Sequence, residues 1–201
     1  MGNKDYRTLF LEKSLLGRKT NFDNTDEVIL NCIKRAYRDM LTAGRFYLVN
    51  DTENNVENNI DTRCNKFKSI LEKANYIYSR NLIKETFIIF TDKDKIVKNS
   101  DNRWATDYGL SQKLVNMTYK YFYVFKDYIK IDIDFSNCDC PLDSVILGEK
   151  LKLKGYIWSK LTEKEYEYCQ KIITEQLLQE DLNTELKSLG NLAFDFINWV
   201  V

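Results

Sequence analysis

Residues 107–125, DYGLSQKLVNMTYKYFYVF, carry amide, basic and phenolic side chains at helical spacing. Side chains three and four positions apart lie on the same face of a helix. We take the polar and aromatic members of this flank as candidate binding residues: Gln112, Lys113, Asn116, Tyr119, Lys120 and Tyr123. Amides, ammonium groups and rings make hydrogen bonds and stack, so the chemistry they offer is contact with a ligand. The alternative is that the amides bond to neighbouring loops while the tyrosine rings pack with their hydroxyls outward.

The chain contains no His. This excludes Ser-His-Asp and Cys-His nucleophile activation, His-ligated zinc sites and the side chain used most often for general acid–base catalysis. The passage RNLIKE at 80–85 begins like the Arg–His motif of helical ribonucleases of the HEPN kind and then lacks the His. Signatures such as GxxxxGKS/T, GxGxxG and HExxH are also missing. We therefore assign no catalytic residue and no cofactor, and favour a protein that is not an enzyme.

Carboxylates gather in one connection of the chain. The four residues are Asp132, Asp134, Asp139 and Asp143. Hard divalent cations need several oxygen ligands, so this segment is a candidate metal site. The alternative is a solvated loop whose last Asp residues cap a following helix. We favour the loop, assign no metal, and keep a metal-dependent enzyme as an alternative function.

Cys138 and Cys140 form a CxC pair. A structural zinc site needs four ligands, and the other three Cys fall on apolar faces of predicted helices, where a free Cys is usually buried. Cys140 also precedes the predicted helix start at Pro141, and a helix N-terminus lowers the pKa of a thiol. The sequence therefore favours a reactive thiol at Cys140 over a metal site.

Charge is balanced over the whole chain, with Lys plus Arg and Asp plus Glu both at 30. Nucleic-acid binders that neutralise phosphates usually show a basic excess or a basic face. Lys34, Arg35, Arg38 and Arg45 give the first long helix a basic face, but Asp39 beside them favours an ordinary solvated surface. Nucleic acid is therefore not the favoured partner, although an RNA-binding helical module stays an alternative.

The N-terminal residues MGNKDYRTLF lack an apolar signal-peptide core, and no stretch approaches the 18 apolar residues of a membrane span. We expect a cytoplasmic protein with five reduced thiols and no membrane partner.

One Pro and seven Gly leave few breakers, which favours helices. We predict a mainly α, single-domain bundle of about six or seven helices, with one short strand or extended segment near 129–135. Residues 1–24 form an N-terminal segment, and residues 25–201 form the helical domain. A charged loop at 91–104 joins its two halves.

In the first half, Asn24 or Thr25 is the predicted cap of a helix that ends near Gly44. A regular apolar seam follows at spacings of four and three: Ile60, Cys64, Phe67, Leu71, Ala74 and Tyr78. The passage RNLIKETFIIF continues as helix, with a strand as the alternative for its last four residues.

In the second half, Asp107 is the predicted N-cap of the helix over 107–125. Its apolar residues form one inner stripe: Leu110, Leu114, Met117, Tyr121, Val124 and Phe125. Pro141 suits the first turn of the next helix, capped by Asp139 or Cys140.

The last elements also carry start signals. Thr162 and Glu165 form a capping box, which predicts a helix that begins there. Asp181 is a candidate cap for a further segment, which Gly190 ends.

The passages YGLSQKLVNMTYKYFYVF, CPLDSVIL, IWSKL and LAFDFINW occur in this order within residues 104–201. In this the chain resembles small uncharacterised helical proteins of low-GC bacteria and their phages and mobile elements. Those proteins share a Gly-x-x-Gln-Lys-x-x-Asn-Met helix, a Cys-Pro-x-Asp helix start and a closing apolar-aromatic-Trp segment. They usually carry His after the Gly and before the Cys-Pro, where this chain has Leu110 and Asp139. The resemblance implies a helical fold and such an origin, and attaches no activity.

Together these observations favour a non-enzymatic protein-interaction factor, an accessory or anti-defence protein of a phage or mobile element that docks on a host macromolecule. The alternatives are a metal- or nucleotide-dependent enzyme, or an RNA-binding module, that uses the segment 132–143 or the face with Gln112, Asn116 and Lys120. The sequence leaves the oligomeric state open.

Overall fold

We describe the fold from a computed structural model, which defines residues 12–17, 19–44, 47–48, 53–90, 96–97 and 106–199. In these ranges the chain is a single, mainly α-helical domain, which confirms the predicted fold class. The boundary after residue 24 stays a prediction. The predicted loop at 91–104 lies outside the described residues, apart from 96–97.

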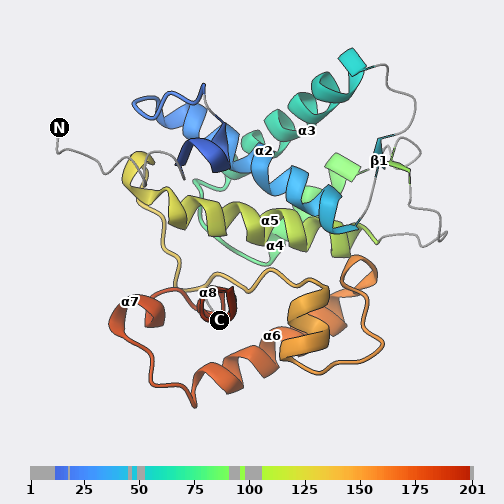
Figure 1. Cartoon of the computed structure of the whole chain (residues 1–201), viewed down its shortest axis with the longest axis vertical. Helices are drawn as coiled ribbons and strands as arrows, with labels where there is room; N and C mark the ends of the chain where they lie inside the picture. The colour runs from blue at the N-terminus through green and yellow to red at the C-terminus, as the bar shows by residue number, and fades with distance from the viewer. Residues whose placement is uncertain are drawn as a thin grey trace.

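Helix α2 (Thr25–Gly44) begins where the capping signal predicts. The Asn24 side chain accepts a hydrogen bond from the backbone N–H of Glu27, which satisfies a donor that the first turn leaves free. Helix α2 packs against α3 (Glu53–Lys73) and more extensively against α5, so its inner side is almost fully buried. These three helices form the upper layer in Figure 1.

The seam of α3 is confirmed from Ile60 to Leu71, because its members are buried against α2 and the following turn. The helix then ends at Lys73, earlier than the seam predicts. Asn75 and Tyr76 have φ values of 50° and 57°, in the left-handed region, and they turn the chain back toward the core.

The passage RNLIKETFIIF folds as helix α4 (Asn81–Glu85) and the 3₁₀ turn η1 (Thr86–Phe90). The strand alternative for FIIF is therefore wrong. The Thr86 hydroxyl donates to the carbonyl of Leu82, a local bond that competes with an extended backbone.

Helix α5 (Asp107–Val124) runs through the centre of the molecule (Figure 1). Its N-cap is Thr106 and not Asp107: the Thr106 hydroxyl accepts from the N–H of Gly109 at 2.9 Å. Every residue from Tyr108 to Phe122 is buried, so the helix has no solvated face over that length. A helix buried all round lies between two layers.

Residues 125–143 lead from α5 into the lower layer. After the turn η3 (Lys126–Tyr128), Ile129 is extended, and the segment 129–135 contains a bend and forms no strand. The strands in the described ranges are β1 (Tyr47–Leu48) and β2 (Ile96–Val97), which pair antiparallel.

The next helix starts later than predicted. Pro141 and Leu142 are not helical, and the side chain of Asp143 accepts from the N–H groups of Val145 and Ile146 at 3.0 and 2.9 Å. The cap is thus Asp143, and neither Asp139 nor Cys140. A short π-helical turn, η4 (Ile146–Lys150), follows.

The lower layer contains the remaining elements. The turn η5 (Trp158–Lys160) leads into α6 (Glu163–Leu177), and the predicted capping box of Thr162 and Glu165 is present in full. Helix α6 therefore begins directly after Thr162, where the sequence predicts its start.

Helix α7 (Thr184–Lys187) is capped by Asn183 and not by Asp181. Gly190, with φ of 54°, makes the turn into α8 (Leu192–Trp199). None of the described helices is both long enough and apolar enough to cross a bilayer.

Candidate functional site

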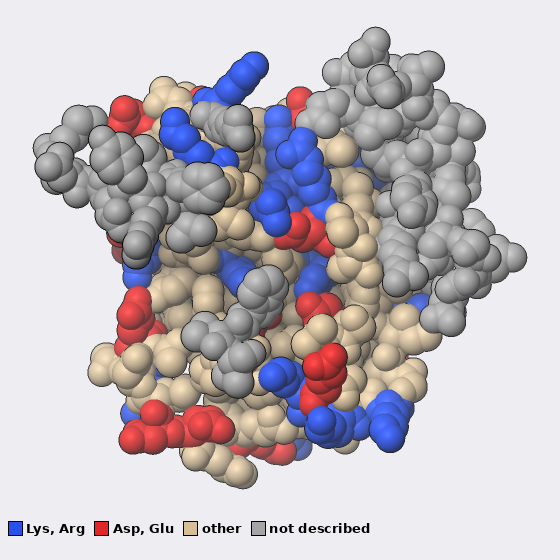
Figure 2. Space-filling model, viewed as in Figure 1, with Lys and Arg blue, Asp and Glu red and all other residues tan. Residues whose placement is uncertain are grey.

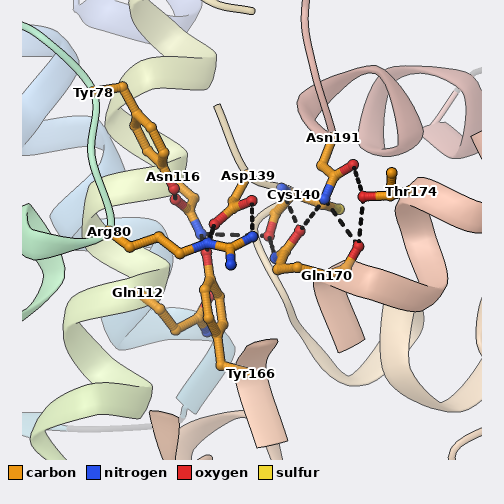
Figure 3. A network of polar contacts seen from close by, with 10 residues as sticks. All are labelled: Tyr78, Arg80, Gln112, Asn116, Asp139, Cys140, Tyr166, Gln170, Thr174 and Asn191. Carbon is orange, nitrogen blue, oxygen red and sulfur yellow. Dashed lines mark hydrogen bonds and ion pairs between the residues drawn. The ribbon is translucent and has the colours of Figure 1, made fainter. Parts of the chain in front are cut away.

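The candidate binding residues of α5 point into the molecule. Gln112, Lys113, Asn116, Tyr119 and Lys120 are buried, and Tyr123 is partly buried. Each of them has a partner inside the protein, described below. Their partners come from the turn 76–78, the segment 140–143, α6, α7 and α8, and Figure 3 shows those around Asn116 and Gln112.

Asn116 lies at the centre of a buried hydrogen-bond network. Its side-chain oxygen accepts from the Tyr78 hydroxyl and its amide donates to the Tyr166 hydroxyl, both at 2.8 Å. Tyr166 in turn donates to a carboxylate oxygen of Asp139 at 2.9 Å. The guanidinium of Arg80 completes the chain with two bonds to Asp139, at 2.7 and 3.0 Å.

Burial raises the pKa of Tyr78 and Tyr166, so both phenols remain protonated donors at neutral pH. Each phenol therefore donates to an oxygen acceptor: Tyr78 donates to the Asn116 side chain, and Tyr166 donates to the Asp139 carboxylate. Asp139 is buried, whereas the Arg80 side chain is 45% exposed, so the ion pair reaches from the interior to the surface. Such a network fixes the relative positions of α4, α5 and α6.

Two glutamines hold the segment 140–142 beside this network. Gln112 of α5 donates to the carbonyl of Leu142 and accepts from its N–H, at 3.1 and 3.2 Å. Gln170 of α6 pairs in the same way with Cys140, at 2.7 and 3.1 Å. Pro141 between them has no N–H to satisfy. The amides replace the partner strand that the segment lacks, which explains why it is buried without belonging to a sheet.

Asn191 extends the network toward α8. Its amide donates to the carbonyl and to the side-chain oxygen of Gln170, at 3.0 and 3.1 Å. The Thr174 hydroxyl donates to the side-chain oxygen of Asn191 at 2.9 Å. Gln170 is thus fixed from both sides (Figure 3).

The two lysines of α5 are paired with carboxylates. Lys113 lies 3.0 Å from Asp143, and Lys120 contacts Asp195 of α8. Burial by itself raises the pKa of Asp143, but the Lys113 ammonium and two backbone N–H groups outweigh it, so the pKa lies below its ordinary value. Burial raises the pKa of Asp195, in spite of Lys120.

The two tyrosines of the candidate set also have internal partners. Tyr119 donates to the carbonyl of Tyr76 at 3.1 Å. Tyr123 donates to Glu185 of α7, next to Lys126. All six residues therefore bond within the protein, and their role as contacts for an external ligand stays a prediction without structural support.

The acidic connection does not assemble into a metal site. Among the described residues, no group of three or more His, Cys, Asp or Glu side chains is placed to hold an ion. Asp139 and Asp143 face basic partners, and Asp134 accepts from the N–H of Ser136.

The reactive-thiol prediction for Cys140 is wrong. Cys140 is fully buried and does not begin a helix, and burial raises its pKa well above the ordinary thiol value. Burial also raises the pKa of Cys138. Both thiols are therefore protonated and shielded at neutral pH.

The basic residues of α2 behave as a solvated face. Lys34 pairs with Asp61 at 2.7 Å, and Arg35 pairs with Asp39 at 3.1 Å. Arg45 lies outside the described residues.

Arg80, Tyr166, Gln170 and Asn191 belong to the network but were not among the residues predicted from the sequence. One signal was present: Gln170 lies four positions after Tyr166, on the inner side of α6, where an amide needs a buried partner. Arg80 and Asn191 gave no such signal, because both lie in turns whose neighbours only the fold determines.

Two of the hollows on the described surface border α6, and Thr174 and Asn191 of the buried network line the first of them. One, of about 400 Å³, lies between α6 and α7, and we call its apolar wall (Leu177, Leu178, Leu182 and Leu186) the leucine groove. The other, of about 370 Å³, lies in front of α6, and we call it the lysine pocket; its lining is Lys154, Gly155, Tyr156, Ile157, Lys160, Leu161 and Glu165.

Comparisons of the chain with family models, with curated proteins and with solved structures found no match.

Proposed function

We propose that the protein is a non-enzymatic interaction factor that docks on another protein through the leucine groove. The observation that carries this proposal is the exposure of Leu178, which is 80% accessible at the mouth of that groove. The polar side chains of α5 support it indirectly, because they bond inside the protein and leave contact with partners to the surface.

The groove has the size and lining of a site for apolar side chains. Leu177 and Leu178 come from the end of α6, Leu182 from the connection, and Leu186 from α7. Isolated exposed leucines are ordinary, but several leucines around one hollow fit the anchor residues of an amphipathic helix.

The charges around the groove indicate which kind of partner helix would bind there. Within 174–191 there are four acidic residues and one Lys; Glu175 and Glu185 pair with Lys171 and Lys126, and Lys187 lines the groove together with Glu180. Glu180 lines the groove and Asp181 follows it, both exposed and without an ion pair to any described residue. Figure 2 shows acidic side chains at the lower left, over the connection between α6 and α7. The proposed partner is therefore a protein segment with an apolar helical face flanked by Lys and Arg.

A peptide experiment tests this proposal. The probe is a fluorescent amphipathic peptide of about 14 residues made of Leu and Lys with leucines at helical spacing, and its control replaces Lys with Glu. We expect saturable binding of the Leu–Lys peptide, weakened by salt, and none of the Leu–Glu peptide.

Variants locate the binding. Leu178→Ser and the double variant Glu180→Lys, Asp181→Lys should each weaken binding about tenfold with the melting temperature unchanged. Ile77→Ser is the matched control, since Ile77 is 67% exposed and does not line the groove. Equal binding of both peptides, or no effect of Leu178→Ser, would contradict the proposal. A dimer that Leu178→Ser dissolves would identify a second copy as the occupant and would also overturn it.

We propose further that the partner belongs to a host cell, and that the protein is an accessory or anti-defence factor of a phage or mobile element. The resemblance over residues 104–201 supports this origin. Expression of the protein in a defence-bearing bacterial host should raise the plating efficiency of a restricted phage. Leu178→Ser should lose the effect, and an equal gain with that variant would separate this role from the groove.

A further inference from the structure

The lysine pocket lies on the loop between η4 and α6, on a different part of the lower layer from the leucine groove. In Figure 2, Lys and Arg side chains gather at the lower right, over the orange loop that precedes α6 in Figure 1. The sequence KLKLKGYIWSK at 150–160 supplies four Lys and no acidic residue. This is a local positive charge in a chain whose net charge is zero.

Within the described part of the chain, the lysines of the pocket have no counter-ion. Lys154 and Lys160 both line it, both are exposed, and neither forms an ion pair with a residue that the structure describes. Two like charges on one concave surface repel each other, and an anion between them removes the repulsion.

The acidic member of the lining is already engaged. Glu165 accepts from the backbone N–H and from the hydroxyl of Thr162, both at 2.8 Å, as part of the capping box of α6. Its charge is directed at the helix N-terminus, where it compensates the helix dipole. Glu165 therefore reduces the positive potential of the pocket without neutralising either lysine directly.

The backbone beside the pocket carries a lysine where a glycine fits better. Lys152 has φ of 57°, and the next residue, Leu153, donates from its N–H to the carbonyl of Leu147 at 2.8 Å. This is the pattern of a helix C-terminal cap, in which the left-handed residue is usually Gly. A side chain in this left-handed conformation is less favourable than glycine. Lys152 therefore adds a third positive charge beside the pocket in spite of its unfavourable backbone conformation.

The other wall of the pocket is apolar. Tyr156 is partly exposed, Ile157 is 38% exposed and Leu161 is buried behind them. A volume of about 370 Å³ lies within the range of small-molecule sites. A ligand that matches both walls carries an anion at one end and a ring or short chain at the other.

We propose that the lysine pocket binds the phosphate ester of a small molecule, with the phosphate between Lys154 and Lys160 and the organic part against Tyr156 and Leu161. This site is separate from the proposed docking function, since no residue of the lysine pocket belongs to the leucine groove.

Calorimetric titration of the full chain with four probes tests the proposal, in a buffer without divalent cations: inorganic phosphate, pyrophosphate, ADP and adenosine. ADP should bind most tightly, pyrophosphate more weakly and inorganic phosphate weakest, with no heat from adenosine. The double variant Lys154→Gln, Lys160→Gln should weaken ADP binding at least tenfold. Tyr156→Ala should weaken ADP binding and leave pyrophosphate binding unchanged.

Two further variants separate charge from stability. Lys152→Gly should raise the melting temperature, because it relieves the left-handed strain, and still lower ADP affinity through the lost charge. Lys66→Gln removes an exposed lysine of α3 and should change neither. Failure of every probe to saturate, or equal affinity of the double variant and Lys66→Gln, would overturn the proposal. So would binding of a single-stranded RNA that ADP does not displace, since the site would then serve a polymer.

Discussion

At the scale of single residues, Asn116 shows how one amide can organise a core. It is fully buried and satisfies two phenols, from α6 and from the turn before α4, while Asp139 and Arg80 extend the chain of bonds. A buried polar group without a partner costs more than the bond contributes when it is present. The buried hydroxyls of Tyr78 and Tyr166 therefore make the amide at this position a requirement of the fold.

We expect Asn116→Leu to lower the free energy of unfolding by about 2–4 kcal/mol, because it keeps the volume and leaves two buried hydroxyls with fewer partners. Urea denaturation measures this. Asn137→Ala is the control, since Asn137 is exposed and bonds only to Ser136 among the contacts described here. A loss in Asn116→Leu no larger than in the control would show that the network contributes little.

The depressed pKa of Asp143 predicts a pH dependence. The folded carboxyl has a pKa below its ordinary value of 3.8, so its contribution is present above that pH and is lost as the pH falls through the folded pKa. We expect Asp143→Asn to be less stable than the wild type at neutral pH and equally stable in strong acid. Thermal unfolding between pH 7 and pH 2 tests this, and a gap that widens on acidification would contradict the assignment.

At the scale of elements, α5 owes its position to close approach as well as to polar bonds. A Cβ added at Gly109 would lie 2.5 Å from the backbone carbon and oxygen of Ser159, so α5 and η5 touch backbone to backbone there. The cap residue Thr106 joins the same two elements: its N–H donates to the carbonyl of Ser159, and its hydroxyl donates to that of Leu161. Glycine is needed at position 109 for space.

Gly109→Ala should therefore destabilise the protein by about 2 kcal/mol or more, although alanine is the better helix former. Gly148 in η4 is the matched control, because a Cβ there would meet nothing within 4 Å. Gly148→Ala should leave stability unchanged or raise it by up to about 1 kcal/mol. Chemical denaturation of the two variants separates the steric effect of the added Cβ from helix propensity. Similar stabilities would show that the backbone of Ser159 moves easily to make room for a Cβ at position 109.

At the scale of the whole molecule, the buried network joins an upper layer of α2, α3 and α5 to a lower layer that contains α6, α7 and α8. Asp139 lies at this junction and faces Arg80 and Tyr166 from opposite layers. The lower layer carries both the leucine groove and the lysine pocket. The junction therefore keeps the two proposed surfaces at fixed positions on one body.

We expect Asp139→Asn to speed hydrogen exchange in α6 more than in α2, because it weakens the bonds that hold the lower layer. Asp132→Asn, at an exposed position, should leave exchange in both helices unchanged. Mass spectrometry of deuterated peptides measures both. Equal acceleration in α2 and α6 would indicate that the layers unfold only together.

Much of the helical framework could be predicted from the sequence, since capping and periodicity are local properties. The capping box at Thr162 and the start of α2 are examples. The start of the helix after Pro141 could not be predicted from the sequence. The backbone of Cys140 and Leu142 bonds to side-chain amides of distant helices and does not form a helical turn. The candidate binding residues stay a prediction, and their partners in other elements lie 24 to 75 positions away along the chain, beyond the reach of local patterns.

The sequence by itself determined the helical class, the absence of histidine chemistry and the polar flank of α5. Only the tertiary structure decided that this flank faces inward, since an amphipathic helix can lie on the surface or between two layers with the same periodicity. It also decided which charges pair inside and which remain at the leucine groove and the lysine pocket. Burial and pairing depend on contacts between segments far apart in the chain, and a local pattern does not contain them.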